Sequence, residues 1–194
     1  MGKCAWCLDG GIMEQYHDNE WGNILHDDQK HFEYLLMEVM QCGLNWNMML
    51  KKREIFRECF AAFDYDQIAK FTEDDIVRIL ATEGMIKSRR KIQAIINNTN
   101  CFLKIRSEYG SFDQYLWSFS GNQTFVYRRH QEGYGEDKNE LSDRISKDMK
   151  KRGFKYLGSI TIYSHLQACG MINDHSYDCF KYDELIKQGN IKYF

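Results

Sequence analysis

Cysteine and histidine residues near both ends of the chain have the types and spacing of a metal site. Cys4, Cys7 and His17 lie close to the start, and His175 and Cys179 lie near the end. A His and a Cys four residues apart can bind one ion, and two Cys/His pairs could complete a tetrahedral zinc site. Spacing alone leaves open whether His17 or Cys7 joins the other three residues. An exposed tail with an incidental histidine and cysteine is the competing interpretation.

Aromatic side chains and one carboxylate could form a pocket for a flat ring. Tyr16 and Trp21 bound the segment YHDNEW, and Trp6 and Trp46 lie beside further polar residues. Glu38 lies in a predicted helix with apolar neighbours, where it could accept hydrogen bonds from a ligand. Aromatic faces favour a cationic ring. The competing interpretations are core packing for the aromatic residues, and solvent or a cation as the partner of Glu38.

A glycine and several basic residues near the middle of the chain could bind phosphate. Gly84 lies between two predicted helices, and Lys87 and Arg89 stand at the start of the second. Backbone N–H groups at a helix N-terminus attract anions, and the basic side chains add positive charge. An ordinary helical hairpin is the competing interpretation.

These residues must be positioned by helices, because helical periodicity dominates the sequence. Apolar residues recur at helical spacing over 27–41, and a second helix begins after Asn45. Residues 72–103 are predicted to form a helix, a hairpin and a helix, the second capped by Ser88. Further helices are expected at 141–152 and over SITIYSHLQACG, after a long surface loop at 120–140. The sequence shows no strand pattern, so the expected class is all-α.

The composition is that of a globular protein with a substantial core. Of the 194 residues, 43% are hydrophobic and 28% are charged, and the net charge of -2 leaves any nucleic-acid partner to a local basic patch. A chain of this length forms one domain or two lobes that share a core. No apolar run is long enough to cross a membrane, and MGKCAWCLDG lacks the apolar stretch of a secretory signal. With an odd number of cysteines, seven, we expect reduced thiols and a cytoplasmic location.

Five longer motifs coincide, in order, with those of one known family. They are YHDNEWG at 16–22, LKKRE at 50–54, RKIQAIINN at 90–98, ISKDMKKRGFKYLG at 145–158 and QACGMINDH at 167–175. On these motifs the sequence resembles the 3-methyladenine DNA glycosylase I family, bacterial base-excision repair enzymes of the helix-hairpin-helix superfamily. The resemblance runs nearly end to end, and motifs of this length and order are highly specific.

The resemblance implies an all-α helix-hairpin-helix glycosylase fold that forms one catalytic unit over residues 1–194. One lobe, approximately 23–109, would contain the hairpin, and residues 1–22 plus 110–194 would form the other. A structural zinc ion would join the terminal segments within the second lobe. The resemblance also settles the open ligand question in favour of the set Cys4, His17, His175 and Cys179.

The resemblance assigns roles to the pocket residues as well. Tyr16 and Trp46 would stack on a flipped base, from which Glu38 would accept hydrogen bonds. Trp6 and Trp21 would help to close the pocket. The implied reaction is hydrolysis of the N-glycosidic bond of 3-methyladenine in alkylated double-stranded DNA. It would release the free base and leave an abasic site without lyase activity, because no lysine is placed to form a Schiff base.

The DNA itself would be held by residues outside the pocket. Gly84, Lys87 and Arg89 would contact phosphates, and Leu44, beside Gly43 at a helix junction, would enter the gap left by the base. A core leucine is the competing interpretation of Leu44. We further expect a monomer without membrane contact, located in the bacterial cytoplasm.

The sequence departs from the family pattern at a few places. Asn45 stands where the family usually has a serine, and Ser159 stands where it usually has a proline. The loop at 120–140 and the tail after Cys179 match poorly. None of these departures affects the five pocket residues or the four ligands.

Two other functions are consistent with parts of the sequence. A non-catalytic, zinc-stabilised DNA-binding module would bind DNA in a salt-dependent way without releasing a base. A zinc hydrolase would use His17 and Glu20 at an open, three-ligand site and would lose its activity on chelation.

Overall fold

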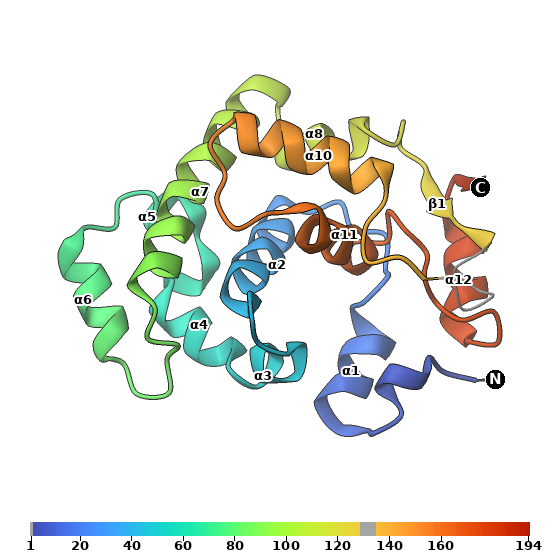
Figure 1. Cartoon of the computed structure of the whole chain (residues 1–194), viewed down its shortest axis with the longest axis horizontal. Coiled ribbons are helices and arrows are strands. Elements are labelled where there is room, and N and C mark those ends of the chain that lie inside the picture. Colours follow the sequence, from blue (N-terminus) through green and yellow to red (C-terminus); the bar gives the residue numbers. More distant parts are fainter. Residues whose placement is uncertain (1, 129–134) are drawn as a thin grey trace.

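Helices form most of the structure, a computed structural model that describes residues 2–128 and 135–194 (Figure 1). The first half contains η1 (Ala5–Cys7), α1 (Gly11–Asn19), α2 (Asp28–Gln41), α3 (Trp46–Lys51), α4 (Arg53–Cys59), η2 (Ala61–Phe63), α5 (Tyr65–Ile68) and α6 (Glu73–Ala81). The second half contains α7 (Arg89–Tyr109), α8 (Phe112–Ser118), α10 (Glu140–Lys151), α11 (Ser159–Ala168) and α12 (Phe180–Gln188). The predicted all-α class is confirmed. Within the described ranges, no helix combines the length and the apolar character needed to cross a membrane.

Most of the predicted helices begin where the sequence places their caps. The side chains of Asp27 and Asn45 each accept a hydrogen bond from the backbone N–H three residues on, at 2.7 and 2.9 Å. Thr72 and Asp75 form the expected capping box at the start of α6. Ser88 occupies the N-cap position of α7, but its side chain makes no capping hydrogen bond. The predicted helix, hairpin and helix are present, and α7 continues well beyond its expected end.

The helix α2 lies at the centre of the fold (Figure 1), and its residues 31–40 are all buried. It packs against α3, α7, α8 and α11, which come from both of the predicted lobes. One apolar core runs from Tyr16 to Ile172 and crosses the predicted lobe boundary. The core is therefore shared, while the division into the lobes 23–109 and 1–22 plus 110–194 stays a prediction.

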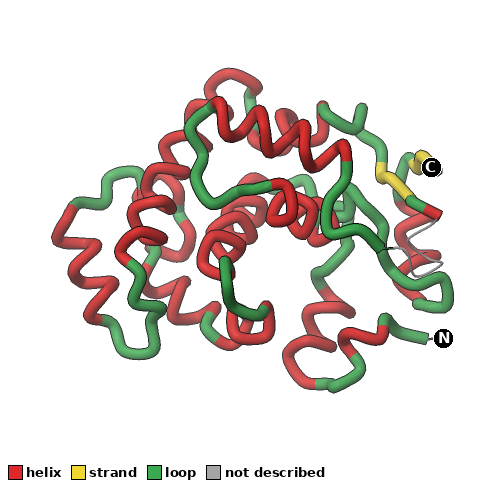
Figure 2. The backbone as a smooth tube through the Cα atoms, viewed as in Figure 1, coloured by secondary structure: helices red, strands yellow, loops and turns green. Residues whose placement is uncertain are grey.

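Two short strands contradict the expectation that the chain has none. β1 (Thr124–Val126) and β2 (Ile191–Tyr193) form a parallel pair near the C-terminus (Figure 2). Three residues are too few for the alternating pattern by which a strand is recognised in a sequence. The unassigned tail after Cys179 consists mainly of α12 and β2. β1 lies in the predicted loop 120–140, of which residues 129–134 fall outside the described part of the chain.

The N-terminal segment pairs with a segment close to the C-terminus. Gly2 donates a backbone hydrogen bond to Asp178 at 2.9 Å, and Phe180 donates one to Gly2 at 3.2 Å. Figure 1 shows both chain ends on the same side of the molecule. This pairing brings the neighbourhoods of Cys4 and Cys179 together.

A partly buried ion network fixes the segment YHDNEW against the helices. Arg53 of α4 donates to both carboxylate oxygens of Glu20, at 2.7 and 2.8 Å, and also to Glu33 of α2. Lys30 lies 2.9 Å from Glu20. Burial opposes the charged form of Glu20, but the hydrogen bonds from Arg53 and Lys30 outweigh it and lower its pKa to about 2. Glu20 is therefore a structural anchor for this segment.

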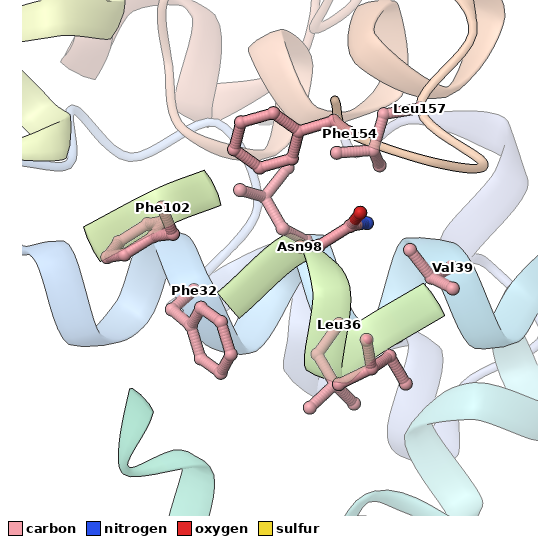
Figure 3. Close-up of a pocket in the computed structure, with 9 residues that line it drawn as sticks. Phe32, Leu36, Val39, Asn98, Phe102, Phe154 and Leu157 are labelled. Carbon is pink, nitrogen blue, oxygen red and sulfur yellow. The ribbon is translucent and has the colours of Figure 1, made fainter. Parts of the chain in front are cut away.

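A small apolar cavity lies between α2, α7 and the loop before α11 (Figure 3). Its volume is about 10 Å³, and its walls are mostly apolar side chains such as Phe32, Val39 and Phe102. The polar wall residue Asn98 is already engaged, because its amide donates to the carbonyl of Lys155 and accepts from the N–H of that residue. A space that admits at most one water between engaged walls is a packing gap in the core.

We expect Gly170→Ala to destabilise the protein by more than about 2 kcal/mol, as measured by urea unfolding. Gly170 has a φ of +72°, and a Cβ there would lie 2.7 Å from the carbonyl oxygen of Gly22, which follows Trp21. The left-handed conformation alone costs a non-glycine residue roughly 1–2 kcal/mol, and the clash with the backbone adds to that cost.

The matched control for this substitution is Gly121→Ala. Gly121 also has a positive φ, +64°, but no atom lies within 4 Å of an added Cβ. Gly121→Ala should therefore lower the free energy of unfolding only by the cost of the left-handed conformation, roughly 1–2 kcal/mol. Equal losses from the two substitutions would mean that the close approach of Gly170 to Gly22 contributes nothing to stability.

Candidate functional site

A cavity of about 530 Å³ opens between α1, α2 and α3 on one side and α11 on the other. Its volume lies in the range of small-molecule sites. All of the predicted pocket residues line it, namely Trp6, Tyr16, Trp21, Glu38 and Trp46. The structure thus brings together side chains that the sequence distributes over the first 46 residues and several separate elements.

The aromatic walls of this cavity pack against one another. Tyr16 is buried, and its ring centroid lies 5.7 Å from that of Trp46. Trp6 and Trp21 meet edge to face at 5.0 Å, and Trp6 keeps 38% of its surface exposed. The Nε1 of Trp46 is buried without a hydrogen-bond partner among the described residues. The cavity is therefore lined by aromatic rings and by the Nε1–H donor of Trp46, for which the described residues offer no acceptor.

Glu38 projects from the last turn of α2 into this apolar surrounding. Its side chain is 3% exposed, and its Oε2 has no hydrogen-bond partner in the described part of the chain. Burial raises the pKa of Glu38 from its ordinary value of 4.5 to about 8. The carboxyl group is therefore mostly protonated at pH 7 when the cavity holds no charged ligand, and it can donate as well as accept a hydrogen bond.

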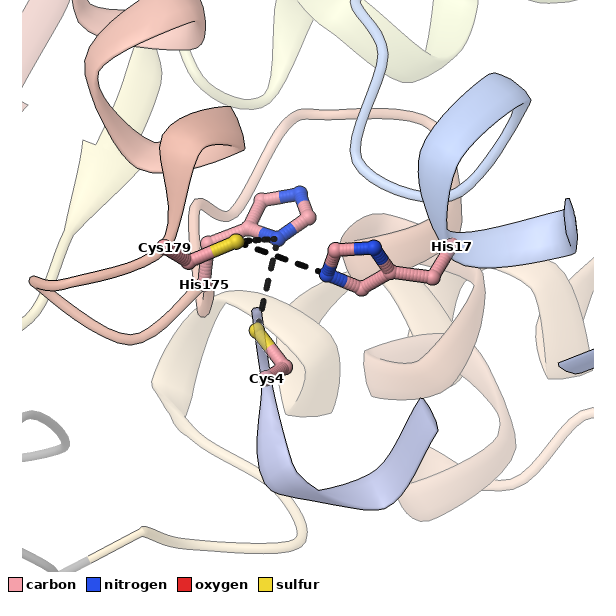
Figure 4. Close-up of side chains that lie close together, drawn as sticks. All are labelled: Cys4, His17, His175 and Cys179. Carbon is pink, nitrogen blue, oxygen red and sulfur yellow. Dashed lines mark hydrogen bonds between the residues drawn. The ribbon is translucent and has the colours of Figure 1, made fainter. Parts of the chain in front are cut away.

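Two thiols and two imidazoles converge beside the cavity (Figure 4). The four ligand atoms, from Cys4, His17, His175 and Cys179, lie within 4.8 Å of one another, and all four residues are buried. The sulfur of Cys4 lies 3.5 Å from Nδ1 of His175, and the sulfur of Cys179 lies 3.5 Å from Nε2 of His17. This set of two sulfurs and two nitrogens fits a closed tetrahedral metal site.

Cys7 stays outside this cluster. Its thiol donates to the carbonyl oxygen of Cys4 at 3.0 Å, because η1 turns it back toward the preceding backbone. The ring of His17 has a second partner, since its Nδ1 lies 2.8 Å from Asp18. A carboxylate in that position orients a ligand histidine. The geometry therefore supports the ligand set that contains His17.

The four-residue Cys/His cluster and the cavity share a wall. The ring of Trp21 lies 4.5 Å from the ring of His175, and the ring of Trp6 lies 5.3 Å from that of His17. Gly22 directly follows Trp21, and a Cβ at Gly22 would collide with the ring of His175. The positions of the two tryptophans therefore depend on the positions of the two histidines.

The residues predicted to contact DNA do not line the cavity. Gly43 has a φ of +83°, and the next residue, Leu44, is 38% exposed, which argues against a core leucine. The carbonyl of Gly84 accepts a hydrogen bond from a lysine of the loop before α4. Lys87 is exposed, and Arg89 forms an ion pair with a glutamate at the start of α6. Arg89 would have to leave this pair to bind a phosphate.

Comparison with known proteins decides the family of this chain. The family model for methyladenine glycosylase matches residues 6–182. The chain belongs to the methyladenine glycosylase family. It is 40% identical over 182 residues to DNA-3-methyladenine glycosylase 1 of Escherichia coli (strain K12), a match that covers 94% of this chain and 97% of that protein.

Solved structures of the methyladenine glycosylase family have the same fold. A crystal structure of 3-methyladenine DNA glycosylase I has a TM-score of 0.87 at 40% identity, and the match covers 92% of this chain and 98% of that one. The Staphylococcus aureus 3-methyladenine DNA glycosylase I, in a structure concerned with 3-methyladenine recognition, has a TM-score of 0.87 at 34% identity. That match covers 94% of this chain and 97% of the other.

The cavity of this methyladenine glycosylase has further walls that the sequence reasoning missed. They are Met13, Gln41, Gly135, Glu136, Asp137, Ser164, Gln167 and Asp174. Asp174 accepts hydrogen bonds from Gln167 at 2.7 Å and from the hydroxyl of Tyr163 at 2.6 Å. Gln167 and Asp174 lie within the motif QACGMINDH. The motif therefore contained these two wall residues, but the sequence analysis gave a role only to its last residue, His175.

The zinc hydrolase alternative does not fit this family or this geometry. Glu20, which such a hydrolase would use, accepts hydrogen bonds from Arg53 on both carboxylate oxygens. The hydrolase's metal site would need an open position, whereas four side chains that could all bind one ion converge here. The alternative is therefore rejected.

We expect Glu38→Gln to gain stability relative to the wild type as the pH rises from about 4.5 to about 8. The neutral carboxyl binds its proton more tightly in the folded chain, so its stabilising contribution is complete below 4.5 and is lost as the pH rises through 8. The amide does not titrate. The difference in unfolding free energy should grow by at most about 1.4 kcal/mol per pH unit within this window.

Urea unfolding of both proteins at several pH values measures this difference. Glu83→Gln, which changes an exposed side chain, controls for the loss of a charge alone. A difference between Glu38→Gln and the wild type that is flat from pH 4.5 to 8 would contradict the burial effect described for Glu38.

Proposed function

We propose that this chain acts in base-excision repair and hydrolyses the N-glycosidic bond of 3-methyladenine in alkylated double-stranded DNA. The free base is released, and an abasic site remains. The observation that carries the proposal is the cavity in which four aromatic side chains surround the buried carboxyl of Glu38. The names of the similar proteins from Escherichia coli and Staphylococcus aureus support the same substrate.

The aromatic walls suit the charge and shape of the damaged base. Methylation at N3 makes adenine cationic while it is still joined to the sugar, so it leaves readily with the bonding electron pair. Water then supplies the hydroxyl group at the sugar carbon and gives up a proton. Extruding a base costs a few kcal/mol, and stacking on an aromatic face returns roughly 1–3 kcal/mol per base. Tyr16 and Trp46 are the proposed stacking faces, with Trp6 and Trp21 closing the pocket.

Glu38 is the proposed reader of the base. A cation that enters the pocket favours the carboxylate, because an opposite charge nearby lowers the pKa of an acid. Glu38 would then accept hydrogen bonds from the N–H groups of the base, as its unpaired Oε2 allows. Neutral adenine would neither pair with the carboxylate nor gain as much from the aromatic faces.

The proposed DNA contacts lie outside the cavity. Gly84, Lys87 and Arg89 would bind phosphates through the turn and the start of α7. Leu44, exposed beside Gly43, would fill the space that the extruded base leaves in the duplex. We propose that the protein works as a monomer in the bacterial cytoplasm.

The proposed ion in the four-ligand cluster is zinc, in a structural role. Four buried protein ligands leave no position for a substrate, which excludes a catalytic use of the ion. When bound, zinc would hold the thiolates and imidazoles together and so join the N-terminal segment to the C-terminal one. A site of this kind contributes on the order of 10 kcal/mol to folding.

The proposed function predicts that incubation with methylated DNA releases 3-methyladenine, which chromatography detects as the free base. Glu38→Ala should slow this release about 10- to 100-fold, because hydrogen bonds to a charged group contribute roughly 1.5–3 kcal/mol each. Binding of Glu38→Ala to DNA that already carries an abasic site should stay nearly unchanged.

Lys87→Ala should show the opposite pattern to Glu38→Ala, with DNA binding affected and base binding unaffected. It should weaken binding to abasic-site DNA and lower the salt slope by about one unit for the lost phosphate contact. Its affinity for free 3-methyladenine should stay unchanged. Wild-type protein that binds the DNA but releases no base would favour the non-catalytic DNA-binding module instead.

The proposed zinc site predicts that Cys4→Ser loses one zinc ion per chain, whereas Cys7→Ser retains it. Both substitutions remove a buried thiol, but only the sulfur of Cys4 faces the histidine ligands. Elemental analysis of the purified proteins measures the difference. Retention of the ion by Cys4→Ser together with its loss from Cys7→Ser would refute this ligand set.

A further inference from the structure

A second group of metal-binding residue types converges outside the cavity and outside the four-ligand cluster. His31 of α2 and His165 of α11 meet with Cys169, which directly follows α11. One ligand atom of each lies within 4.8 Å of the others, and all three side chains are completely buried. Nδ1 of His31 and Nε2 of His165 are 3.2 Å apart. Cys169 lies within the motif QACGMINDH, but neither the sequence analysis nor the proposed reaction gives any of the three residues a role.

The ring nitrogen of His31 that faces away from His165 has a carboxylate partner, as metal-binding histidines commonly do. Its Nε2 lies 3.2 Å from a carboxylate oxygen of Asp113, which leaves Nδ1 to face His165. The carboxylate of Asp113 also lies 3.1 Å from Nδ1 of His26, a side chain that is 55% exposed. Carboxylates of this kind fix the ring and tautomer of a ligand histidine. Hydrogen bonds through Asp113 thus connect the buried ring of His31 to the exposed ring of His26.

The hydrogen bond between the two histidines does not use all of the polar atoms of these three residues. Nδ1 of His165 is buried and has no hydrogen-bond partner in the described ranges. The thiol of Cys169 donates a hydrogen bond of 3.6 Å to the carbonyl of Leu166, a weak interaction that a bond to a metal ion could replace.

We propose that His31, His165 and Cys169 form a second metal site for a borderline transition-metal ion of the zinc class. Ligand atoms around tetrahedral zinc are separated by about 3.3–3.8 Å, given metal–ligand bonds of about 2.0–2.3 Å. Nδ1 of His31 and Nε2 of His165 are 3.2 Å apart, close to this spacing. The sulfur of Cys169 lies within 4.8 Å of its partners and would have to approach by up to about 1.3 Å. The charge also balances, because a divalent ion meets one thiolate and, through His31, the carboxylate of Asp113.

An ion at this site would connect the two helices that face each other across the cavity. His31 shares α2 with Glu38 and Gln41, and His165 lies between Ser164 and Gln167 on α11. α2 and α11 already pack together, and the ion would add bonds between them. The site would therefore help to fix the distance between the two helices that line the cavity. The proposal does not depend on the reaction proposed above.

The test is the difference in metal content between the wild type and Cys169→Ser. After saturation with cobalt, as a spectroscopic substitute for zinc, and removal of free ions, the wild type should hold one more ion per chain than Cys169→Ser. The ion lost should carry part of the cobalt–thiolate absorption. The control Cys101→Ser removes a buried thiol that belongs to neither cluster and should keep the wild-type number.

His31→Leu tests the same site from the other helix and should also lose one ion. The ion count of Cys4→Ser reports separately on the four-ligand cluster, so a failure there is distinguishable. Equal ion content in the wild type, Cys169→Ser and His31→Leu overturns the proposal. A parallel titration with monovalent copper tests the choice of metal. If the wild type binds the extra ion as copper but not as cobalt, the assignment to the zinc class is wrong.

Discussion

The convergence of Cys4, His17, His175 and Cys179 is the constraint on which the rest of the site depends. It joins residues that are up to 175 positions apart, and the backbone pairing of Gly2 with Asp178 and Phe180 brings them together. The imidazoles then support the two tryptophans that wall the cavity. Without this cluster, the N-terminal segment would keep the contacts of Glu20 with Arg53 but would lose the support behind Trp6 and Trp21.

The second constraint is the burial of a carboxyl group at the wall of an aromatic cavity. Glu38 is held neutral by desolvation, which is unfavourable once the pH exceeds its ordinary range. In the proposed function a cationic base would reverse this cost, because it would pair with the carboxylate and stack on the rings. The protein is thus less stable with an empty pocket at high pH than it would be with an amide there. The proposed selectivity for a charged base and the cost in stability would then have the same origin, the burial of Glu38.

Much of the fold could be predicted because local signals were strong. Asp27, Asn45 and the pair of Thr72 and Asp75 cap the helices that the periodicity indicated. The three-residue strands could not be predicted, since β1 and β2 pair across more than sixty residues and neither is long enough to show a period. The side-chain bond expected of Ser88 is absent, because occupying a cap position does not oblige the hydroxyl to bond.

The candidate site was predictable to a different degree in each part. Residue types and spacing indicated a metal site, but the choice of His17 over Cys7 needed family resemblance, and the structure explains it by the turn of η1. The walls contributed by Gln167 and Asp174 depend on how α11 packs, which no local pattern gives. His31 and His165 are 134 residues apart and occur in separate helices, so only the folded chain brings them together.

The most direct test of this account is the affinity of the protein for free 3-methyladenine before and after removal of the proposed zinc ion. Quenching of tryptophan fluorescence measures it on the native protein, on chelated protein and on protein to which zinc has been returned. The account predicts that Kd rises at least about tenfold on chelation, a loss of about 1.4 kcal/mol, and recovers with zinc. An unchanged Kd in the metal-free protein would contradict the claim that the four-ligand cluster positions the pocket walls.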